Sequence, residues 1–252
     1  MRQLSNLLRL VLLALPMLVK ADEPIRQKLT CYNDVLEPYF IRDGDRFIGL
    51  NADVMVEAAK RIGIALELRE MPWKRLEEEI KRGSASLVEC AFAFSRMPAR
   101  EAYMEYTNVV MQKAQYVLFI RNESSYRSLD DLNGKVIGIH RGFRLPDAVK
   151  DGAAAGRFTL EEVATDRTNF LKLAAGRIDA VMINYDVGMY LLGQMNQRGV
   201  RALQPPLAYL DNYLVFTRGK GLSNLIPMFD KAIADIQQDG TYARLRKRYI
   251  SE

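Results

Sequence analysis

Two local signals meet in one short segment of the chain, Ser128-Leu129-Asp130-Asp131-Leu132-Asn133-Gly134-Lys135-Val136-Ile137-Gly138. Its first half, closed by Gly134, predicts a short helical turn. Its second half is apolar and predicts a strand over residues 135–139. A helical turn that leads into a buried strand is expected where an α/β unit begins. The segment therefore predicts that a second α/β unit starts in the middle of the chain.

The same alternation of strand and helix patterns extends from this segment in both directions. Before it, the patterns predict strands over 28–32, 64–69 and 86–94 and helices over 51–62 and 73–82. After it, they predict a helix around Pro146, a strand over 158–163, a helix capped by Asp166, strands over 179–183 and 213–217, and helices over 225–237 and to 250. This alternation predicts an α/β fold with mostly parallel sheets. Two such sets without a Pro/Ser-rich linker imply two lobes.

The first 21 residues carry the pattern of a cleaved secretory signal. Arg2 and Arg9 flank the start of an apolar run over 10–19, and Val19-Lys20-Ala21 fits a small-residue cleavage site. The run is shorter than the roughly 20 apolar residues that span a bilayer, which disfavours a membrane anchor. We therefore expect a signal peptide over 1–21 and a periplasmic location for the mature chain.

Composition narrows the class of partner. The chain has 252 residues, of which 49% are hydrophobic, enough for one large or two small domains. Removing residues 1–21 takes away three basic and no acidic residues, so the formal net charge falls from +5 to +2. Because basic and acidic residues are also interspersed, the sequence predicts no nucleic-acid partner.

The motifs of several enzyme and cofactor classes are absent from the sequence. It contains no Walker A motif, no G-x-G-x-x-G after a strand, no G-x-S-x-G, no H-E-x-x-H and no C-x-x-C. His140 is the only histidine, which excludes a multi-histidine metal site. We therefore expect no catalytic residue, metal or cofactor. His140 is interpreted either as a structural residue or as a ligand contact.

Short motifs between Leu29 and Ile250 resemble a single family. In chain order they are Asp34, Pro38-Tyr39, Phe47 to Asp53, Trp73 to Gly83, Ser95 to Arg100, Ser128 to Gly138, Gly176 to Val181 and Asp239-Gly240. In this order and spacing the chain resembles the family 3 periplasmic solute-binding proteins, the amino-acid-binding type that serves ABC importers.

The resemblance implies a fold and a division of the chain. The fold is the type II periplasmic-binding-protein fold, in which two α/β lobes are joined by two hinge strands and close on a ligand in the cleft between them. It implies that lobe 1 comprises residues 22–115 and 208–252, and lobe 2 residues 116–207. The implied partners are a small-molecule ligand and, transiently, an ABC permease in the inner membrane, with the protein as a monomer.

Three candidate ligand contacts come from the first lobe. Arg100 matches the family arginine that grips the α-carboxylate of the ligand, and a planar guanidinium suits two parallel hydrogen bonds to a carboxylate. Ser95 matches a hydroxyl or backbone contact, and Trp73 an aromatic wall. The ordinary alternatives are a surface arginine at a helix start and a tryptophan on the apolar face of its own helix.

The remaining candidates lie at the ends of predicted strands, where open α/β sheets bind ligands. They are Tyr32, Asp34 and Tyr39 after the first strand, and His140, Gly142, Phe143 and Arg144 after the strand over 135–139. Backbone N–H groups of the second loop could meet an anion. Arg144 could add a positive charge there, and Tyr39 could equally be core.

The sequence departs from the family pattern at a critical position. Asn184 stands where the family usually has the aspartate that binds the α-ammonium group, and we expect it to face Arg100 across the cleft. Removing one partner of a buried charged pair costs on the order of 2–5 kcal/mol. The sequence therefore favours a small carboxylate, either an amino acid or a related compound. Asp34, Asp186 or a carbonyl group are the alternative partners for an ammonium group.

The two cysteines, Cys31 and Cys90, lie in strands that the resemblance places side by side. Neighbouring strands are about 4.8 Å apart, within the range of a disulfide, and an exported protein permits one. We expect a bridge, with two buried free thiols as the alternative.

Three functions remain open at this stage. The favoured one is capture of a solute for an ABC importer, without catalysis. The second is a periplasmic dehydratase of cyclohexadienyl substrates, known among relatives of the family, which would need a positioned acid such as Glu37, Glu89 or Asp186. The third is a sensor module that presents its ligand to a receptor.

Overall fold

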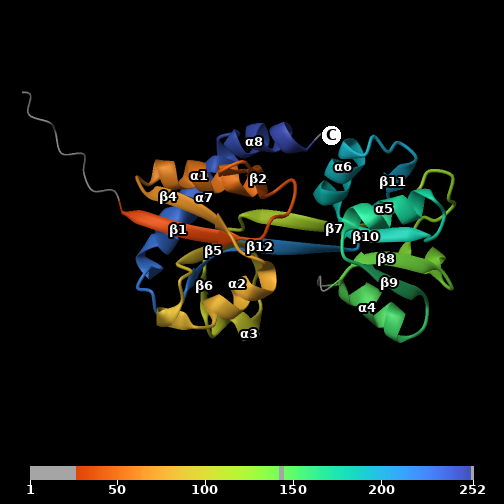
Figure 1. Cartoon of the computed structure of the whole chain (residues 1–252), viewed down its shortest axis with the longest axis horizontal. Coiled ribbons are helices and arrows are strands. Elements are labelled where there is room, and N and C mark those ends of the chain that lie inside the picture. Colours follow the sequence, from red (N-terminus) through yellow and green to blue (C-terminus); the bar gives the residue numbers. More distant parts are fainter. Residues whose placement is uncertain (1–26, 142–144, 251–252) are drawn as a thin grey trace, which may run out of the picture.

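The computed structural model describes residues 27–141 and 145–250 (Figure 1). Its strands are β1 (Lys28–Asn33), β2 (Ile41–Asp43), β3 (Arg46–Ile48), β4 (Ala65–Glu70), β5 (Cys90–Ser95), β6 (Met104–Tyr106), β7 (Gln112–Arg121), β8 (Val136–His140), β9 (Thr159–Val163), β10 (Ala180–Asn184), β11 (Val200–Ala202) and β12 (Ala208–Thr217). Its α-helices are α1 (Leu50–Arg61), α2 (Trp73–Ile80), α3 (Pro98–Glu101), α4 (Asp147–Ala154), α5 (Asp166–Ala174), α6 (Tyr185–Gln194), α7 (Ile226–Gln238) and α8 (Thr241–Tyr249). The short 3-10 helices are Gly83–Ala85, Leu129–Leu132 and Ser223–Leu225.

One large sheet runs through both halves of the molecule. Its strand order is β4-β1-β5-β12-β7-β10-β8-β9, with β6 on β12 and β11 on β7. Figure 1 shows lobe 1 around β1, β4 and β5, and lobe 2 around β8, β9 and β10. The long strands β7 and β12 cross from one lobe to the other. The structure is therefore two α/β lobes joined by two strands.

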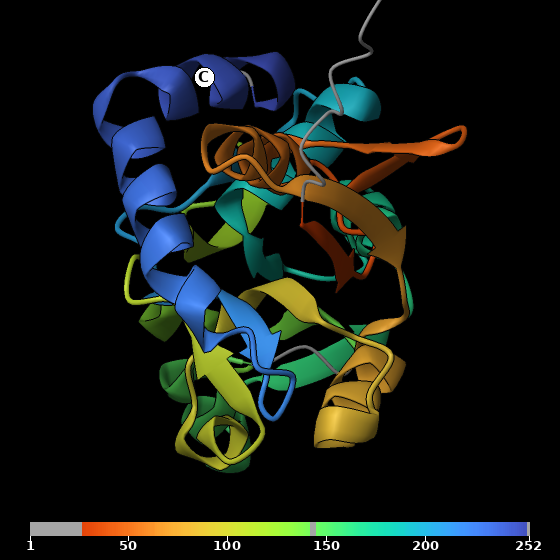
Figure 2. The ribbon, with the colours of Figure 1, turned by 90° about the vertical axis from the view of Figure 1, so that its left-hand side faces the viewer.

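Helices cover both faces of the sheet in lobe 1. On one face, α1 and α7 pack against β1 and β5 through side chains such as Leu29, Met55 and Phe229. On the other face, α2 packs through Leu76 and Ile80. Figure 2 shows this layering from the side of lobe 1. This sandwich fixes α2 beside the carboxyl end of β5, where the candidate site lies.

Lobe 2 repeats the layered arrangement. Phe170 of α5 and Val187 of α6 pack on one side of β7, β8 and β10. Val149 of α4 and Leu132 pack on the other side. Gly188 in α6 is required by this packing, because a Cβ atom there would lie 2.3 Å from the ring of Phe119 in β7. Helix α6, which follows Asn184, therefore packs closely against the connecting strand β7.

The expectation of mostly parallel sheets is wrong for the centre of the molecule. Within the lobes, β1 pairs parallel with β4 and β5, and β8 pairs parallel with β9 and β10. The connecting strands β7 and β12 instead pair antiparallel with each other and with their neighbours β10 and β5. The chain crosses between the lobes once in each direction, so the two connecting strands run in opposite senses.

The two cysteines are joined by a disulfide. Cys31 of β1 lies opposite Cys90 of β5 in parallel register. Their Cα atoms are 4.5 Å apart, and both side chains are fully buried. The bond therefore ties two neighbouring strands in the middle of the lobe 1 core.

The local predictions hold for most elements and are wrong at several positions. The strand expected over 86–94 begins only at Cys90, because Ser86 Oγ accepts a hydrogen bond from the backbone of Val88 and forms a turn. Helix α5 is capped by Thr165, whose hydroxyl accepts a hydrogen bond from the backbone N–H of Thr168, and Asp166 is its first residue.

No helix of the described residues is long and apolar enough to cross a membrane.

Candidate functional site

Arg100 lies on a single turn of helix at the carboxyl end of β5. Pro98 starts α3 after Met97, and the backbone N–H of Arg100 donates to the carbonyl of Met97 at 2.9 Å. The turn brings the side chain back over the strand end. Its Nη1 donates to the carbonyl oxygen of Ser95 at 3.2 Å and to Ser95 Oγ at 3.3 Å. Arg100 and Ser95, both candidate contacts, are thus held together.

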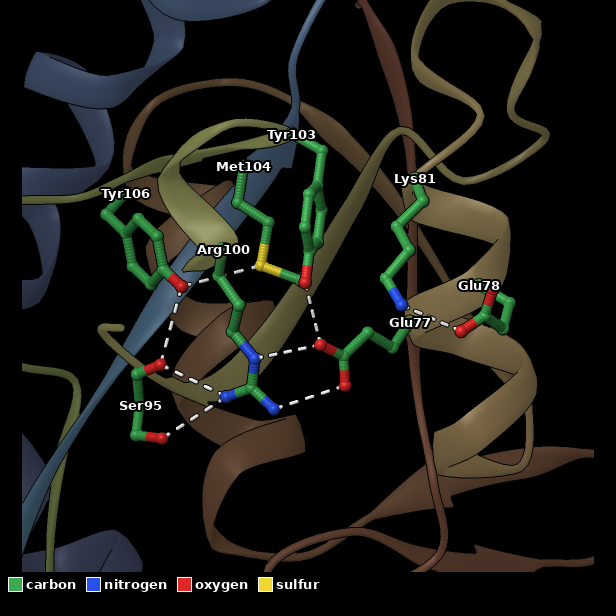
Figure 3. A network of polar contacts seen from close by, with 8 residues as sticks. All are labelled: Glu77, Glu78, Lys81, Ser95, Arg100, Tyr103, Met104 and Tyr106. Carbon is green, nitrogen blue, oxygen red and sulfur yellow. Dashed lines mark hydrogen bonds and ion pairs between the residues drawn. The ribbon is translucent and has the colours of Figure 1, made fainter. Parts of the chain in front are cut away.

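The other edge of the Arg100 guanidinium holds a carboxylate, that of Glu77 in α2 (Figure 3). Nε donates to Oε1 at 3.1 Å, and Nη2 donates to Oε2 at 3.2 Å. Only 13% of the Arg100 side chain and 21% of the Glu77 side chain are exposed. Tyr103 adds a third hydrogen bond, from its hydroxyl to Oε1 at 2.8 Å. The site therefore contains a bidentate arginine–carboxylate pair within the protein itself.

Aromatic rings form the wall behind this pair. The rings of Trp73 and Phe94 stack with their centroids 4.2 Å apart. The guanidinium carbon of Arg100 lies 5.8 Å from the Trp73 ring and 5.3 Å from the Phe94 ring, within the range of cation–π attraction. Asp34 contributes indirectly, since its Oδ2 accepts the backbone N–H of Trp73 at 2.8 Å. Asp34 thus anchors the start of α2.

The charges of this cluster follow from its contacts. Burial acts to raise the pKa of Glu77, but hydrogen bonds from Arg100 and Tyr103 outweigh it, and the pKa lies below its usual value. Burial, followed by the hydrogen bond to Glu77, raises the pKa of Tyr103 to about 12. At neutral pH the cluster holds a guanidinium, a carboxylate and a neutral phenol.

Asn184 has a local structural role in addition to its position at the end of β10. It is the N-cap of α6, and its Oδ1 accepts the backbone N–H groups of Asp186 at 2.9 Å and Val187 at 3.2 Å. The same oxygen accepts the hydroxyl of Tyr39 at 2.9 Å. Asn184 is only 8% exposed. An N-cap favours a short polar side chain, and Asn serves as well as Asp.

Tyr39 connects the two lobes through this contact. Its hydroxyl also lies 2.9 Å from Oδ2 of Asp186, and Oδ1 of Asp186 pairs with Arg246 of α8 at 2.8 Å. Burial, and next the charge of Asp186, raise the pKa of Tyr39, which therefore stays a hydrogen-bond donor. A chain of polar contacts thus passes from lobe 1 to α6 of lobe 2 and back to lobe 1.

Gly49 helps to hold Tyr39 in place. The backbone N–H of Asn51 donates to the carbonyl oxygen of Tyr39 at 2.9 Å. Gly49 lies directly beside that carbonyl group at a φ of 116°, and a Cβ atom would come within 2.6 Å of the carbonyl oxygen. The start of α1 therefore lies so close to the Tyr39 backbone that only glycine, which has no Cβ atom, fits at position 49.

The other predicted residues make none of these polar contacts. Tyr32 is buried in lobe 1, in the hydrophobic cluster that contains Phe94 and against which Trp73 packs. His140 ends β8, and its Nδ1 lies 3.0 Å from Oδ2 of Asp166. Gly142, Phe143 and Arg144 lie outside the described residues. The structure thus brings Arg100, Ser95, Trp73 and Asp34 together, and separately Asn184 and Tyr39.

Two pockets of the described residues have linings that do not include Arg100. One of about 480 Å³ is lined by residues of α1 and α8, among them Arg61 and Arg248, and by Asp239 between α7 and α8. Another of about 400 Å³ lies beside β1 and β4 and includes Tyr32 and Arg69. The described residues contain no group of three or more His, Cys, Asp and Glu side chains able to hold a metal ion.

Glu77 was not among the residues predicted from the sequence. It follows Trp73 by four positions in α2, so the two side chains share one face of that helix. This spacing was available in the sequence. However, its pairing partner Arg100 lies on another element, α3.

Two α/β lobes on a mixed sheet, joined by two long strands, define the class of type II periplasmic binding proteins. Solved structures support this class: the probable amino-acid ABC transporter extracellular-binding protein ytmK of Bacillus subtilis superposes with a TM-score of 0.77 at 17% identity, over 89% of this chain and 97% of that one. The model of the bacterial extracellular solute-binding proteins, family 3, matches residues 30–252. The chain belongs to this family.

Curated relatives are binding proteins of low sequence identity. The probable amino-acid-binding protein YxeM of Bacillus subtilis is 20% identical over 217 residues, covering 85% of this chain and 80% of the relative. The probable histidine-binding protein of Campylobacter jejuni is 24% identical over 225 residues, covering 86% of this chain and 82% of that relative. The predicted family and fold class are thereby confirmed.

Proposed function

We propose that this protein captures a small carboxylate-bearing solute, an amino acid or related compound, and delivers it to an ABC importer without catalysis. It acts in the periplasm after loss of residues 1–21, as a monomer that docks transiently on its permease. Lobe 1 comprises residues 22–115 and 208–252, and lobe 2 residues 116–207. Family membership supports the proposal, as do relatives named for binding amino acids.

The observation that carries the proposal is the geometry of Arg100. Its Nε and Nη2 atoms hold the two oxygens of Glu77 at 3.1 and 3.2 Å. This is the paired arrangement in which guanidinium groups bind carboxylates, and it is about twice as strong per bond as a neutral hydrogen bond. The guanidinium is therefore oriented for a carboxylate, with Ser95 and the Trp73–Phe94 wall around it.

Capture proceeds by closure of the two lobes. The solute binds Arg100 on lobe 1 and then contacts lobe 2, and these second contacts exist only in the closed state. The connecting strands β7 and β12 bend to allow the movement. The solute stabilises the closed form by the free energy of the contacts that the open form lacks.

A thermal-shift screen tests the proposal. The purified mature protein is heated with each standard L-amino acid, with simple organic acids such as succinate and lactate, and with uncharged controls such as glucose. A ligand at 100 times its Kd stabilises the folded state by about 2.7 kcal/mol, or roughly 5–10 °C for a domain of this size. A shift from at least one carboxylate is expected. Shifts from none of them contradict the proposal.

A further inference from the structure

We propose that Glu77 receives the ammonium group of the solute, so that the Arg100–Glu77 pair selects α-amino acids as zwitterions. This inference rests on the proposed function, because it names the solute class for the same site. In the free protein the two side chains neutralise each other. In the complex the solute enters between them, with its carboxylate on Arg100 and its ammonium on Glu77.

Most of the hydrogen-bond donors of Arg100 are already engaged in the free protein. A guanidinium has five N–H donors. Nη1 is engaged by Ser95, and the edge formed by Nε and Nη2 is engaged by Glu77. On the Nε–Nη2 edge, a solute carboxylate can form two parallel bonds only where Glu77 releases it. Binding of a carboxylate at this edge therefore exposes the charge of Glu77.

The released carboxylate needs a cation. Tyr103 still donates to Oε1, but a single neutral donor does not replace a guanidinium. A side chain that is only 21% exposed is poorly hydrated, and an unpaired charge there is costly. An α-amino acid supplies a cation a few ångströms from its own carboxylate. It thus exchanges one ion pair for two, whereas a plain carboxylic acid leaves Glu77 without a hydrogen-bonded cation and with only the charge of Lys81 nearby.

The other carboxylates among the candidate residues hold partners other than Arg100. Asp186 is bound to Arg246 and receives the hydroxyl of Tyr39. Asp34 accepts the backbone N–H of Trp73. Asn184 is neutral, and its Oδ1 accepts three donors. Among the described residues, Glu77 is the carboxylate in direct contact with Arg100, and it offers the charge that Asn184 lacks.

Paired probes and one conservative variant test the inference. The probes are L-histidine, L-arginine, L-glutamine and L-leucine, each with its deamino acid: 3-(imidazol-4-yl)propanoate, 5-guanidinopentanoate, 4-carbamoylbutanoate and 4-methylpentanoate. Affinities are measured by titration calorimetry for the wild type, Glu77→Gln and Glu78→Gln. Glu78 is the matched control, because it neighbours Glu77 on α2 and is 63% exposed beside Lys81 (Figure 3).

We expect the wild type to bind at least one amino acid, and to prefer it to its deamino partner by about 30-fold or more. Glu77→Gln should weaken the amino acid by a similar factor and strengthen the deamino acid, which no longer competes with a resident carboxylate. Glu78→Gln should change neither affinity. The wild-type preference is measured without any variant, so it stands even where Glu77→Gln folds poorly.

Each other outcome has a distinct meaning. A wild type that binds both partners of a pair equally overturns the inference, as does a folded Glu77→Gln variant that binds the amino acid undiminished. In those cases Arg100–Glu77 is a structural ion pair, and the proposed function stands. No binding of either partner in any pair, together with a blank thermal-shift screen, contradicts the proposed function and the inference with it.

Discussion

Arg100 and Glu77 determine each other's charge and position. The guanidinium lies over the Trp73 and Phe94 rings and holds both oxygens of Glu77. Arginine suits this role better than lysine, because its planar group can bind a carboxylate in two places while packing against aromatic rings. The pair supplies fixed charge of both signs at a single place in lobe 1, and a zwitterion is complementary to it.

The ion pair should make stability depend on pH in a defined direction. The pKa of Glu77 is lowered in the folded protein relative to its usual value of about 4.5. The stabilisation is therefore present above about pH 4.5 and is lost as pH falls through the lower folded value. Urea unfolding of the wild type and Glu77→Gln should differ at pH 7 and converge as pH falls toward 3. An equal difference at both pH values contradicts this account.

At the level of residues, the sequence identified Arg100 as a candidate contact but did not identify Glu77. Arg100, Ser95 and Trp73 lie together, as their motif positions indicate. Glu77 was missed because pairing depends on how α2 is placed against α3, which no local pattern encodes. Asn184 was interpreted only through its missing charge, whereas its contacts also make it a helix cap.

At the scale of elements, lobe 1 is held by packing and by one covalent link. The bond between Cys31 and Cys90 joins β1 to β5 across a sequence separation of 59 residues. Closing a loop of this length removes conformational freedom from the unfolded chain, an effect of about 4 kcal/mol in the chain-entropy model. The strand end that carries Ser95 belongs to β5, so the link also supports the candidate site.

Reducing this link should destabilise the protein. The double variant Cys31→Ala/Cys90→Ala is expected to unfold with about 2–4 kcal/mol less free energy than the wild type in urea. Dithiothreitol should lower the melting temperature of the wild type and leave the variant unaffected. Equal sensitivity of both proteins to the reductant would show that the bridge has no such role.

Long periodic elements were predicted well, and those defined by tertiary contacts were not. Helices α1, α2 and α7 appear within two residues of their predicted starts, because their apolar faces repeat at helical spacing. Helix α6 and strand β7 were not predicted. The sequence of α6 contains Gly188, a weak helix former, and its presence is explained by close packing on Phe119.

At the scale of the whole molecule, the lobes are joined by more than the two strands. The hydroxyl of Tyr39 contacts Asn184 and Asp186 of lobe 2, and Asp186 returns to Arg246 of lobe 1. Hydrogen bonds to charged groups contribute about 1.5–3 kcal/mol each. This buried polar connection therefore supports one relative position of the lobes.

The contribution of this connection to stability can be measured by removing the hydroxyl of Tyr39. Tyr39→Phe keeps the ring, leaves Asp186 paired with Arg246, and should lower the free energy of unfolding by about 1.5–3 kcal/mol. Tyr209→Phe is the control, because Tyr209 is 55% exposed on β12 and its change should have little effect. Equal effects of the two variants in urea unfolding would contradict a stabilising role for the connection.

The central claim is that Arg100 binds the carboxylate of the solute, and calorimetric titration of Arg100→Ala tests it most directly. The ligand is the carboxylate that gives the largest thermal shift with the wild type. Arg75→Ala serves as the control, since Arg75 is an exposed residue of α2. The account predicts at least about 30-fold weaker binding for Arg100→Ala and unchanged binding for Arg75→Ala. Wild-type affinity in a folded Arg100→Ala protein would contradict it.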